Sequence, residues 1–205
     1  ELKEKIRTDC KPPLSDGKML KKYGRAESVN PKINSSYKSS FLKDMKLFLA
    51  VEDFKDFTIK VADREFKVHK FIFAVRSQTF AELIKNNPDA DDLELQDISV
   101  EVFECILRYL YTDELLESEN IIEVFAAAGI LKIRGLIKKS AKLLKSSVKY
   151  EKDLENLHKI FNLAIKLDQE ELKSKTFRRI KKHFHGKELN DDLVDQPEKL
   201  KAIIE

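Results

Sequence analysis

The spacing of apolar residues changes twice along the chain, and this change constrains the fold more than any other feature. Apolar residues recur every three or four positions over 39–49, which predicts an amphipathic helix. They then alternate with polar residues over 57–61 and, after a turn at 62–64, over 65–69, which predicts a β-hairpin. Almost every later stretch returns to the helical spacing. This order predicts an α+β domain with a helical extension.

Local signals divide the rest of the chain into further elements. A short apolar helix is expected at 70–76, and a second should start after Ser77, whose hydroxyl can cap its free amides. A short strand is predicted at 93–95. Ser99 is expected to cap the next helix.

Four more helices are expected after these, with a break at 146–151 that separates the last two from the rest. Asp168, three residues before Glu171, resembles a capping box and predicts the start of the final helix. Residues 1–38 are polar and aperiodic and hold three of the five prolines, which predicts a linker or tail. The chain therefore divides into a tail at 1–38, an α+β domain at 39–149 and a helical extension at 150–205.

Composition excludes several classes of site. Five glycines among 205 residues make a glycine-rich phosphate loop improbable, and two cysteines cannot complete a four-ligand zinc site or a disulfide framework. We therefore expect no cofactor, no metal and a reduced cytoplasmic or nuclear location, or both. No apolar run approaches the ~20 residues that a membrane span needs.

His69 is the strongest catalytic candidate, because it lies between a predicted strand and an apolar helix. No cysteine or serine with an orienting acid lies at a motif spacing from it. We interpret His69 as a structural hydrogen-bonding residue and expect a protein without catalytic activity.

Charge is segregated behind a net charge of only +3. Twelve acidic residues and one basic residue fall between Asn86 and Leu131, whereas seven basic residues and no acidic one fall between Lys132 and Lys149. A second basic run follows at 173–187. This pattern favours complementary protein partners, although a solvated helix face remains an alternative. No aromatic residues interleave with the basic runs in a stacking pattern, so nucleic acid is not favoured.

Several separated motifs match one family in order and spacing. They lie at 56–61 (Asp-Phe-Thr-Ile-Lys-Val), 65–80, 95–103 and 107–112 (Leu-Arg-Tyr-Leu-Tyr-Thr). Together they resemble a BTB/POZ domain over about 41–144. Residues 152–185 are similar to the 3-box or early BACK helices that follow this domain in speckle-type POZ and Kelch-like proteins.

The resemblance implies a helical cluster flanked by a small sheet and preceded by a helix that packs in a symmetric homodimer. The stripe of Phe41, Met45 and Phe48 matches the dimer helix, although it could instead pack within its own monomer. Asp56 and Lys70 lie where the family often places an opposite-charge pair near the dimer interface.

The resemblance also implies a function as an adaptor. In the related proteins the domain binds a cullin N-terminal region, that of cullin three, and a separate domain recruits the substrate for ubiquitination. That recruiting domain is expected outside these residues, before residue 1. The residues implied to face the cullin are Phe80, Leu83, Ile84, Pro88, Asp89, Asp91 and Tyr111.

One segment departs from the cullin-binding pattern. Cullin-binding members commonly carry a hydrophobic residue followed two positions later by Glu, whereas this chain has Pro88, Asp89 and Ala90, with Asp91 nearby. The competing interpretation is a BTB module used only for self-association, in a scaffold or a transcriptional regulator. Channel-type tetramerising BTB domains rank lower, because they lack the dimer helix and the C-terminal helices.

Overall fold

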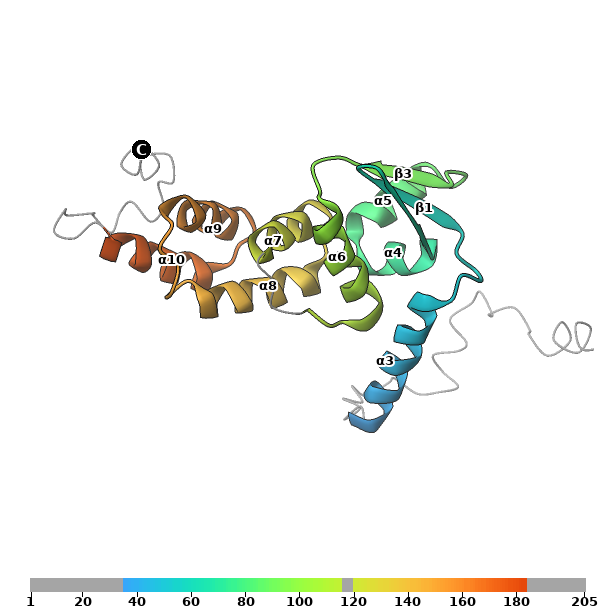
Figure 1. The fold of residues 1–205 in the computed structure, drawn as a ribbon, viewed down its shortest axis with the longest axis horizontal. Coiled ribbons are helices and arrows are strands. Elements are labelled where there is room, and N and C mark those ends of the chain that lie inside the picture. The colour runs from blue at the N-terminus through green and yellow to red at the C-terminus, as the bar shows by residue number, and fades with distance from the viewer. Residues whose placement is uncertain (1–34, 116–119, 184–205) are drawn as a thin grey trace, which may run out of the picture. The chain divides into compact units, whose positions relative to one another are not determined.

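The computed structural model describes residues 35–115 and 120–183, with side chains from Lys43 onward. Helix α3 (Ser35–Ala50) comes first and contains the predicted dimer stripe (Figure 1). It begins inside the segment predicted as a tail, so its first four residues, 35–38, are helical. Residues 1–34 of that predicted tail lie outside the described part of the chain.

A three-stranded sheet follows α3. Strands β1 (Phe57–Val61) and β2 (Arg64–Val68) form the predicted antiparallel hairpin. Strand β3 (Asp92–Leu95) pairs with the other edge of β1 in parallel, which gives the order β2-β1-β3. Every second residue of β1, beginning with Phe57, is buried, because alternate side chains of a strand point to one face.

Three helices cover the buried face of this sheet: α4 (Lys70–Arg76), α5 (Gln78–Asn86) and α6 (Val100–Thr112). Both predicted caps are confirmed. The Ser77 hydroxyl accepts the amide of Phe80 at 3.2 Å, and the Ser99 hydroxyl accepts the amide of Val102 at 3.4 Å. Ser77 is also buried, and its hydroxyl donates at 2.5 Å to the carbonyl of Leu131, the residue that ends the helix at Ile121–Ile130, so Ser77 joins the start of α5 to the end of that helix.

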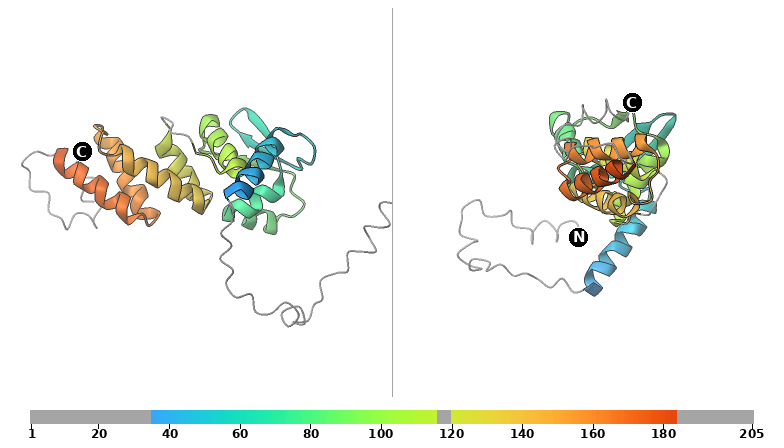
Figure 2. Two further views of the ribbon diagram at one scale, coloured as in Figure 1. Left: turned by 90° about the horizontal axis from the view of Figure 1, so that it is seen from below. Right: turned by 90° about the vertical axis from the view of Figure 1, so that its left-hand side faces the viewer.

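Four further helices complete the described chain: α7 (Ile121–Ile130), α8 (Arg134–Ser147), α9 (Leu154–Lys166) and α10 (Glu170–His183). Helix α10 packs against both α8 and α9, and Figure 2 shows α9 and α10 at the end of the molecule away from the sheet. The predicted cap at Asp168 is wrong. Helix α10 begins at Glu170, and Asp168 has φ 54°, a left-handed conformation in the turn that ends α9.

Two apolar cores hold these elements together. The first joins the sheet to α4, α5 and α6, with Phe73, Phe80 and Phe103 fully buried. The second joins α7, α8, α9 and α10 around Phe125 and Phe161. Because α7 and α8 contribute to both cores, the predicted boundary at residue 149 does not divide one core from the other. Eight helices and three strands among the described residues confirm an α+β fold.

Candidate protein-interaction surfaces

A buried hydrogen-bond network surrounds His69 at the start of α4. Its Nδ1 lies 2.6 Å from the Tyr111 hydroxyl, which also accepts the His69 backbone amide at 3.1 Å. Its Nε2 lies 3.3 Å from the carbonyl of Asp53, which fits a tautomer that donates from Nε2. Burial raises the pKa of the Tyr111 hydroxyl. Both ring nitrogens are therefore engaged, which confirms the structural role predicted for His69.

The dimer stripe predicted on α3 contacts its own domain. The Phe48 ring stacks on His69 with 4.0 Å between centroids, and Met45 and Phe48 are half-buried against the first core. These two residues therefore make contacts within the monomer, and a role of the stripe in a dimer stays a prediction. The Phe41 side chain lies outside the described part of the structure.

Other large apolar side chains on α3, on α4 and in the loop between α3 and β1 face solvent. Leu47 is 68% exposed, Phe71 75% and Val75 66%. Phe54 is exposed too and has φ 68°, an unusual conformation for a bulky residue. A lone exposed apolar residue is ordinary, but several on neighbouring elements indicate an interaction surface.

Asp56 and Lys70 meet, but not as two charged side chains. The Asp56 carboxylate accepts the backbone amide of Lys70 at 2.7 Å. The Lys70 ammonium instead donates to the carbonyls of Pro88 and Ala90 at 2.8 and 2.7 Å. The predicted opposite-charge pair is therefore replaced by a tie between α4 and the loop that follows α5. A role of either residue in a dimer interface stays a prediction.

The cullin-facing candidates separate into core and surface residues. Phe80 is fully buried and Tyr111 is 2% exposed, so their assignment as partner contacts needs correction. Leu83 and Ile84, in contrast, line an apolar pocket of about 90 Å³, and Leu83 is 37% exposed. This pocket lies between α5 and the strands β1 and β3.

The loop after α5 presents its polar residues to solvent. Pro88, Asp89 and Asp91 are all exposed. Because the Lys70 ammonium bonds two carbonyls of this loop, the loop has a fixed position beside the apolar pocket. The arrangement of apolar anchors at the centre and charges at the rim is typical of protein-binding sites.

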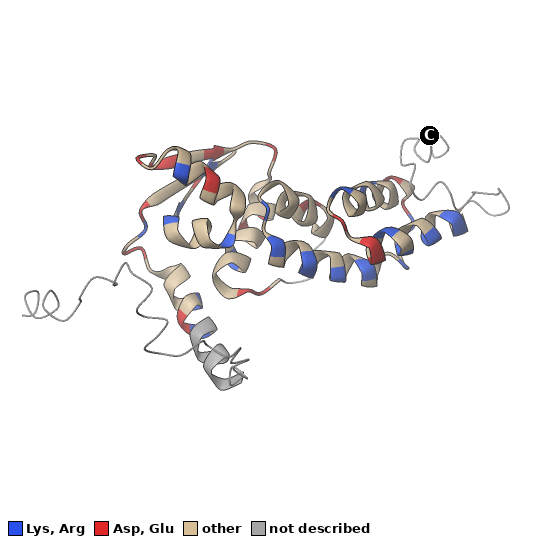
Figure 3. Ribbon diagram, turned by 180° about the vertical axis from the view of Figure 1, so that it is seen from behind, with Lys and Arg blue, Asp and Glu red and all other residues tan. Residues whose placement is uncertain are grey.

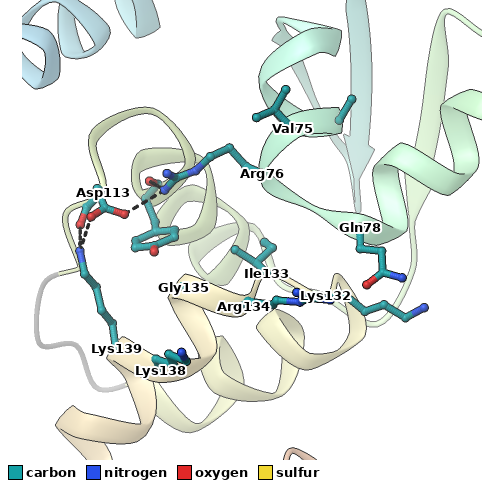
Figure 4. A pocket seen from close by; sticks show the side chains of 12 residues that line it. Val75, Arg76, Gln78, Asp113, Lys132, Ile133, Arg134, Gly135, Lys138 and Lys139 are labelled. Atoms are coloured by element: carbon teal, nitrogen blue, oxygen red, sulfur yellow. Dashed lines mark hydrogen bonds and ion pairs between the residues drawn. The ribbon is translucent and has the colours of Figure 1, made fainter. Parts of the chain in front are cut away.

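A second cavity, of about 740 Å³, lies where α4, α6 and α8 meet (Figure 4). The Asp113 carboxylate accepts hydrogen bonds from Arg76 at 2.9 Å and from Lys139 at 2.8 Å. The Tyr109 ring lies between these cations, 5.1 Å from the Arg76 guanidinium and 5.2 Å from the Lys139 ammonium. The other charged residues that line the cavity are Lys132, Arg134 and Lys138.

The surroundings of Asp113 and Tyr109 in this cavity favour one protonation state of each side chain. Burial raises the pKa of Asp113, but hydrogen bonds from Lys139 and Arg76 outweigh it, so the net pKa is lowered. Burial, followed by the neighbouring Asp113, raises the pKa of Tyr109 to about 12. Asp113 is therefore an anion and Tyr109 a neutral hydroxyl at physiological pH, and the cavity keeps an excess of positive charge.

This ion network could not be predicted from the sequence, because Arg76 and Lys139 lie on two different helices and Asp113 lies just after the end of a third. Nothing in the sequence near position 76 or position 139 indicates that the cation there will contact the carboxylate at 113. Within residues 35–115 and 120–183, no three His, Cys, Asp or Glu side chains cluster as metal ligands. No helix of the same residues is long and apolar enough to cross a membrane.

Two solved BTB domains are similar to this chain over slightly more than half of its length. The BTB domain of zebrafish PATZ1 is 26% identical and covers 55% of this chain and 95% of its own, with a TM-score of 0.49. The BTB domain of human gigaxonin is 25% identical and covers 59% of this chain and 99% of its own, with a TM-score of 0.48.

Curated proteins are similar over different lengths. Zinc finger and BTB domain-containing protein 44 of Rattus norvegicus is 32% identical over 56% of this chain and 26% of its own length. Kelch-like protein 40 of Xenopus tropicalis is 25% identical over 82% of this chain and 28% of its own length. The chain thus spans about a quarter of the length of these relatives. The model of the BTB/POZ domain matches residues 45–148, half of the chain, and the chain belongs to the BTB/POZ family.

Proposed function

We propose that this chain is a homodimeric protein-interaction module, and that it serves in the cytoplasm or nucleus as the cullin-binding adaptor part of a cullin–RING ubiquitin ligase. The observation that carries the cullin assignment is the apolar pocket at Leu83 and Ile84, bordered by the ordered loop that Lys70 holds. The cullin expected from the family resemblance is cullin three. A domain outside these residues would bring the substrate.

The helical extension supports an adaptor. The similarity to Kelch-like protein 40 runs over 174 residues, more than the matched BTB segment at 45–148 contains, so it includes residues outside that segment. The resemblance of α9 and α10 to 3-box or BACK helices, which add cullin-facing surface in the related adaptors, points in the same direction.

The exposed apolar side chains of α3 and α4 support a dimer. Fully burying a side chain such as Leu47, Phe71 or Val75 contributes about 1.5–3 kcal/mol, and a twofold axis uses each residue twice. Met45 and Phe48 hold α3 against its own domain, which presents the opposite side of the helix to a partner. The dimer surface we propose is therefore Leu47, Phe71 and Val75, beside the original stripe.

Light scattering tests this dimer. We expect the wild-type chain to have the mass of two chains at micromolar concentration, and the double variant Phe71→Asp, Val75→Asp to have the mass of one. Both residues are exposed, so the variant should fold, whereas polar substitutions at Met45 and Phe48 would damage the core. Ile130→Asp, at another exposed apolar site, is the matched control and should stay dimeric. A monomeric wild type would refute the dimer.

Calorimetry with a purified cullin N-terminal domain tests the adaptor role. We expect Ile84→Asp to weaken binding more than tenfold, because central apolar anchors usually cost above about 2 kcal/mol when disrupted, whereas Asp89→Asn at the rim should cost under about 1 kcal/mol. Leu83→Ala is a milder change at the same pocket. It tests whether binding is weakened by the loss of an apolar contact with the cullin domain, as distinct from a loss of folding. The absence of binding heat with a dimeric wild type would favour the second candidate function.

That second candidate is a BTB module for self-association alone, in a scaffold or transcriptional regulator. The observation that favours it is the similarity to zinc finger and BTB domain-containing protein 44, together with the acidic loop that departs from the cullin-binding pattern. Both candidate functions predict a homodimer. Only the adaptor predicts a complex with the cullin domain.

A further inference from the structure

A groove of about 420 Å³ between the end of α8 and the outer face of α10 has an unusual lining. Its polar side chains are all cationic, and the buried residue Val148 is the single apolar member. The cations are Lys149, Lys175, Arg178, Arg179, Lys181 and Lys182. Figure 3 shows Lys and Arg in blue along both helices, whereas acidic residues gather near β3. The groove lies well away from the α5 pocket and from the exposed faces of α3 and α4.

Five of these cations lack a carboxylate partner among the described residues. Ion pairs neutralise neighbouring lysines elsewhere on the same helices, as between Lys145 and Glu171. In the groove, by contrast, Arg179 donates to the carbonyl of Glu151 at 2.7 Å, and Lys175 donates to the carbonyl of Lys145 at 2.6 Å. Neutral acceptors fix these side chains without cancelling their charge. The five cations are Lys149, Lys175, Arg178, Arg179 and Lys182.

An exposed aromatic ring lies beside the same groove. Tyr150 is 72% exposed, and the Lys149 ammonium, itself part of the groove lining, lies 4.5 Å from the centroid of its ring. In the sequence, no aromatic residues interleave with the basic runs in a stacking pattern. The second run reaches the neighbouring residue, because the Arg179 guanidinium on α10 donates to the carbonyl of Glu151, which directly follows Tyr150.

We propose that this groove binds single-stranded nucleic acid, with phosphates against the cations of α8 and α10 and a base stacked on Tyr150. A nucleotide supplies both an anionic phosphate and a flat apolar face, and single-strand sites combine a cationic groove with an aromatic platform. An acidic polypeptide would use the cations alone and would leave the exposed ring without a function. The complete set of proposed contacts is Lys149, Tyr150, Lys175, Arg178, Arg179 and Lys182.

Fluorescence anisotropy with the full chain and a labelled oligouridine of roughly 12 nucleotides tests the site, since single-strand sites span about 4–16 nucleotides. Five phosphate contacts predict a slope of about −3.5 in log affinity against log salt, and hence about a hundredfold loss between 50 and 200 mM salt. A measured slope near zero would overturn the proposal.

Charge-neutralising variants distinguish binding in this groove from nonspecific attraction to the positive charge of the whole chain. A triple variant tests three cations of the groove: Lys149→Gln, Arg178→Gln, Lys182→Gln. It keeps Lys175 and Arg179, and its salt slope should be less steep by about 2 than that of the wild type. The matched control, Lys43→Gln, Lys67→Gln, Lys85→Gln, removes the same charge from exposed positions outside the groove and should leave the slope unchanged. Equal losses in both variants would overturn the assignment to this groove.

The aromatic platform has its own readout. Tyr150→Ala should weaken oligouridine binding by about fivefold to a hundredfold, because stacking on an aromatic side chain contributes about 1–3 kcal/mol per base. Tyr150→Phe should bind as the wild type does. If polyglutamate binds as tightly as oligouridine and Tyr150→Ala changes neither affinity, the groove is a site for acidic protein segments and the nucleic-acid proposal is wrong.

Discussion

Gly135, near the start of α8, should tolerate alanine only if the hydroxyl of Tyr109 is removed. A Cβ atom added at Gly135 would lie 2.4 Å from the Tyr109 hydroxyl oxygen, closer than atoms in proteins approach, but 3.6 Å from Cζ of the same ring, an ordinary contact. The Tyr109 hydroxyl is therefore the one group that a Cβ atom at Gly135 would overlap. Tyr109 cannot easily move aside, because it is 2% exposed and lies between Arg76 and Lys139.

Two opposing effects determine how much Gly135→Ala changes the free energy of unfolding. Replacing glycine by alanine within a helix stabilises it by up to about 1 kcal/mol, whereas forcing an extra carbon into a packed site costs about 1–3 kcal/mol. We expect Gly135→Ala to lower the free energy of unfolding by about 1 kcal/mol. In a Tyr109→Phe background the overlap is absent, so the same substitution should raise the free energy of unfolding by about 0.5–1 kcal/mol.

Urea denaturation of the four chains of this double-mutant cycle, followed by circular dichroism, measures the effect. The expected coupling energy between positions 109 and 135 is about 2 kcal/mol, and the effect of Gly135→Ala should change sign between the two backgrounds. If Gly135→Ala has the same effect with and without the Tyr109 hydroxyl, the proposed packing of α6 against α8 is wrong.

Three further predictions concern the other contacts. Tyr111→Phe should lower the free energy of unfolding by about 1–3 kcal/mol in urea denaturation, because it leaves the buried Nδ1 and amide of His69 without their partner. Lys70→Met keeps the apolar stem but frees the loop carbonyls, so hydrogen exchange should accelerate at 87–91 while the melting temperature stays within a few degrees. Asp113 has a lowered pKa, so its carboxylate stabilises the fold above the unfolded-state value of 3.8, and this contribution is lost as pH falls through the lower folded-state value. Asp113→Asn should therefore remove part of the acid sensitivity below about pH 4 in denaturation measured against pH.

The elements could be predicted from the sequence because the signals that define them are local. The alternation at 57–61 marks a strand, and the hydroxyls of Ser77 and Ser99 lie three residues before the amides that they accept. The family resemblance then supplied the arrangement of these elements. Local signals failed at Asp168, where the left-handed turn that ends α9 occupies the position expected for a cap.

The surfaces could be predicted less well, because exposure depends on which elements meet. Tyr111 lies on α6 within a motif that suggested a partner-facing role, but the structure turns it inward to His69. Met45 and Phe48 formed a clear stripe, yet their own domain covers part of it. Lys70 was expected to pair with Asp56 and instead orders the loop beside the α5 pocket. Each outcome depends on contacts between residues more than ten positions apart.

The mass of the complex formed with a cullin N-terminal domain tests the central claim most directly. Multi-angle light scattering of the chain alone should give twice the mass of one chain, and the mixture should give a complex of two chains with two cullin domains. Phe71→Asp, Val75→Asp should convert this to a one-to-one complex, since the α5 pocket is separate from the dimer surface. A monomeric chain that elutes apart from the cullin domain would contradict both parts of the proposed function.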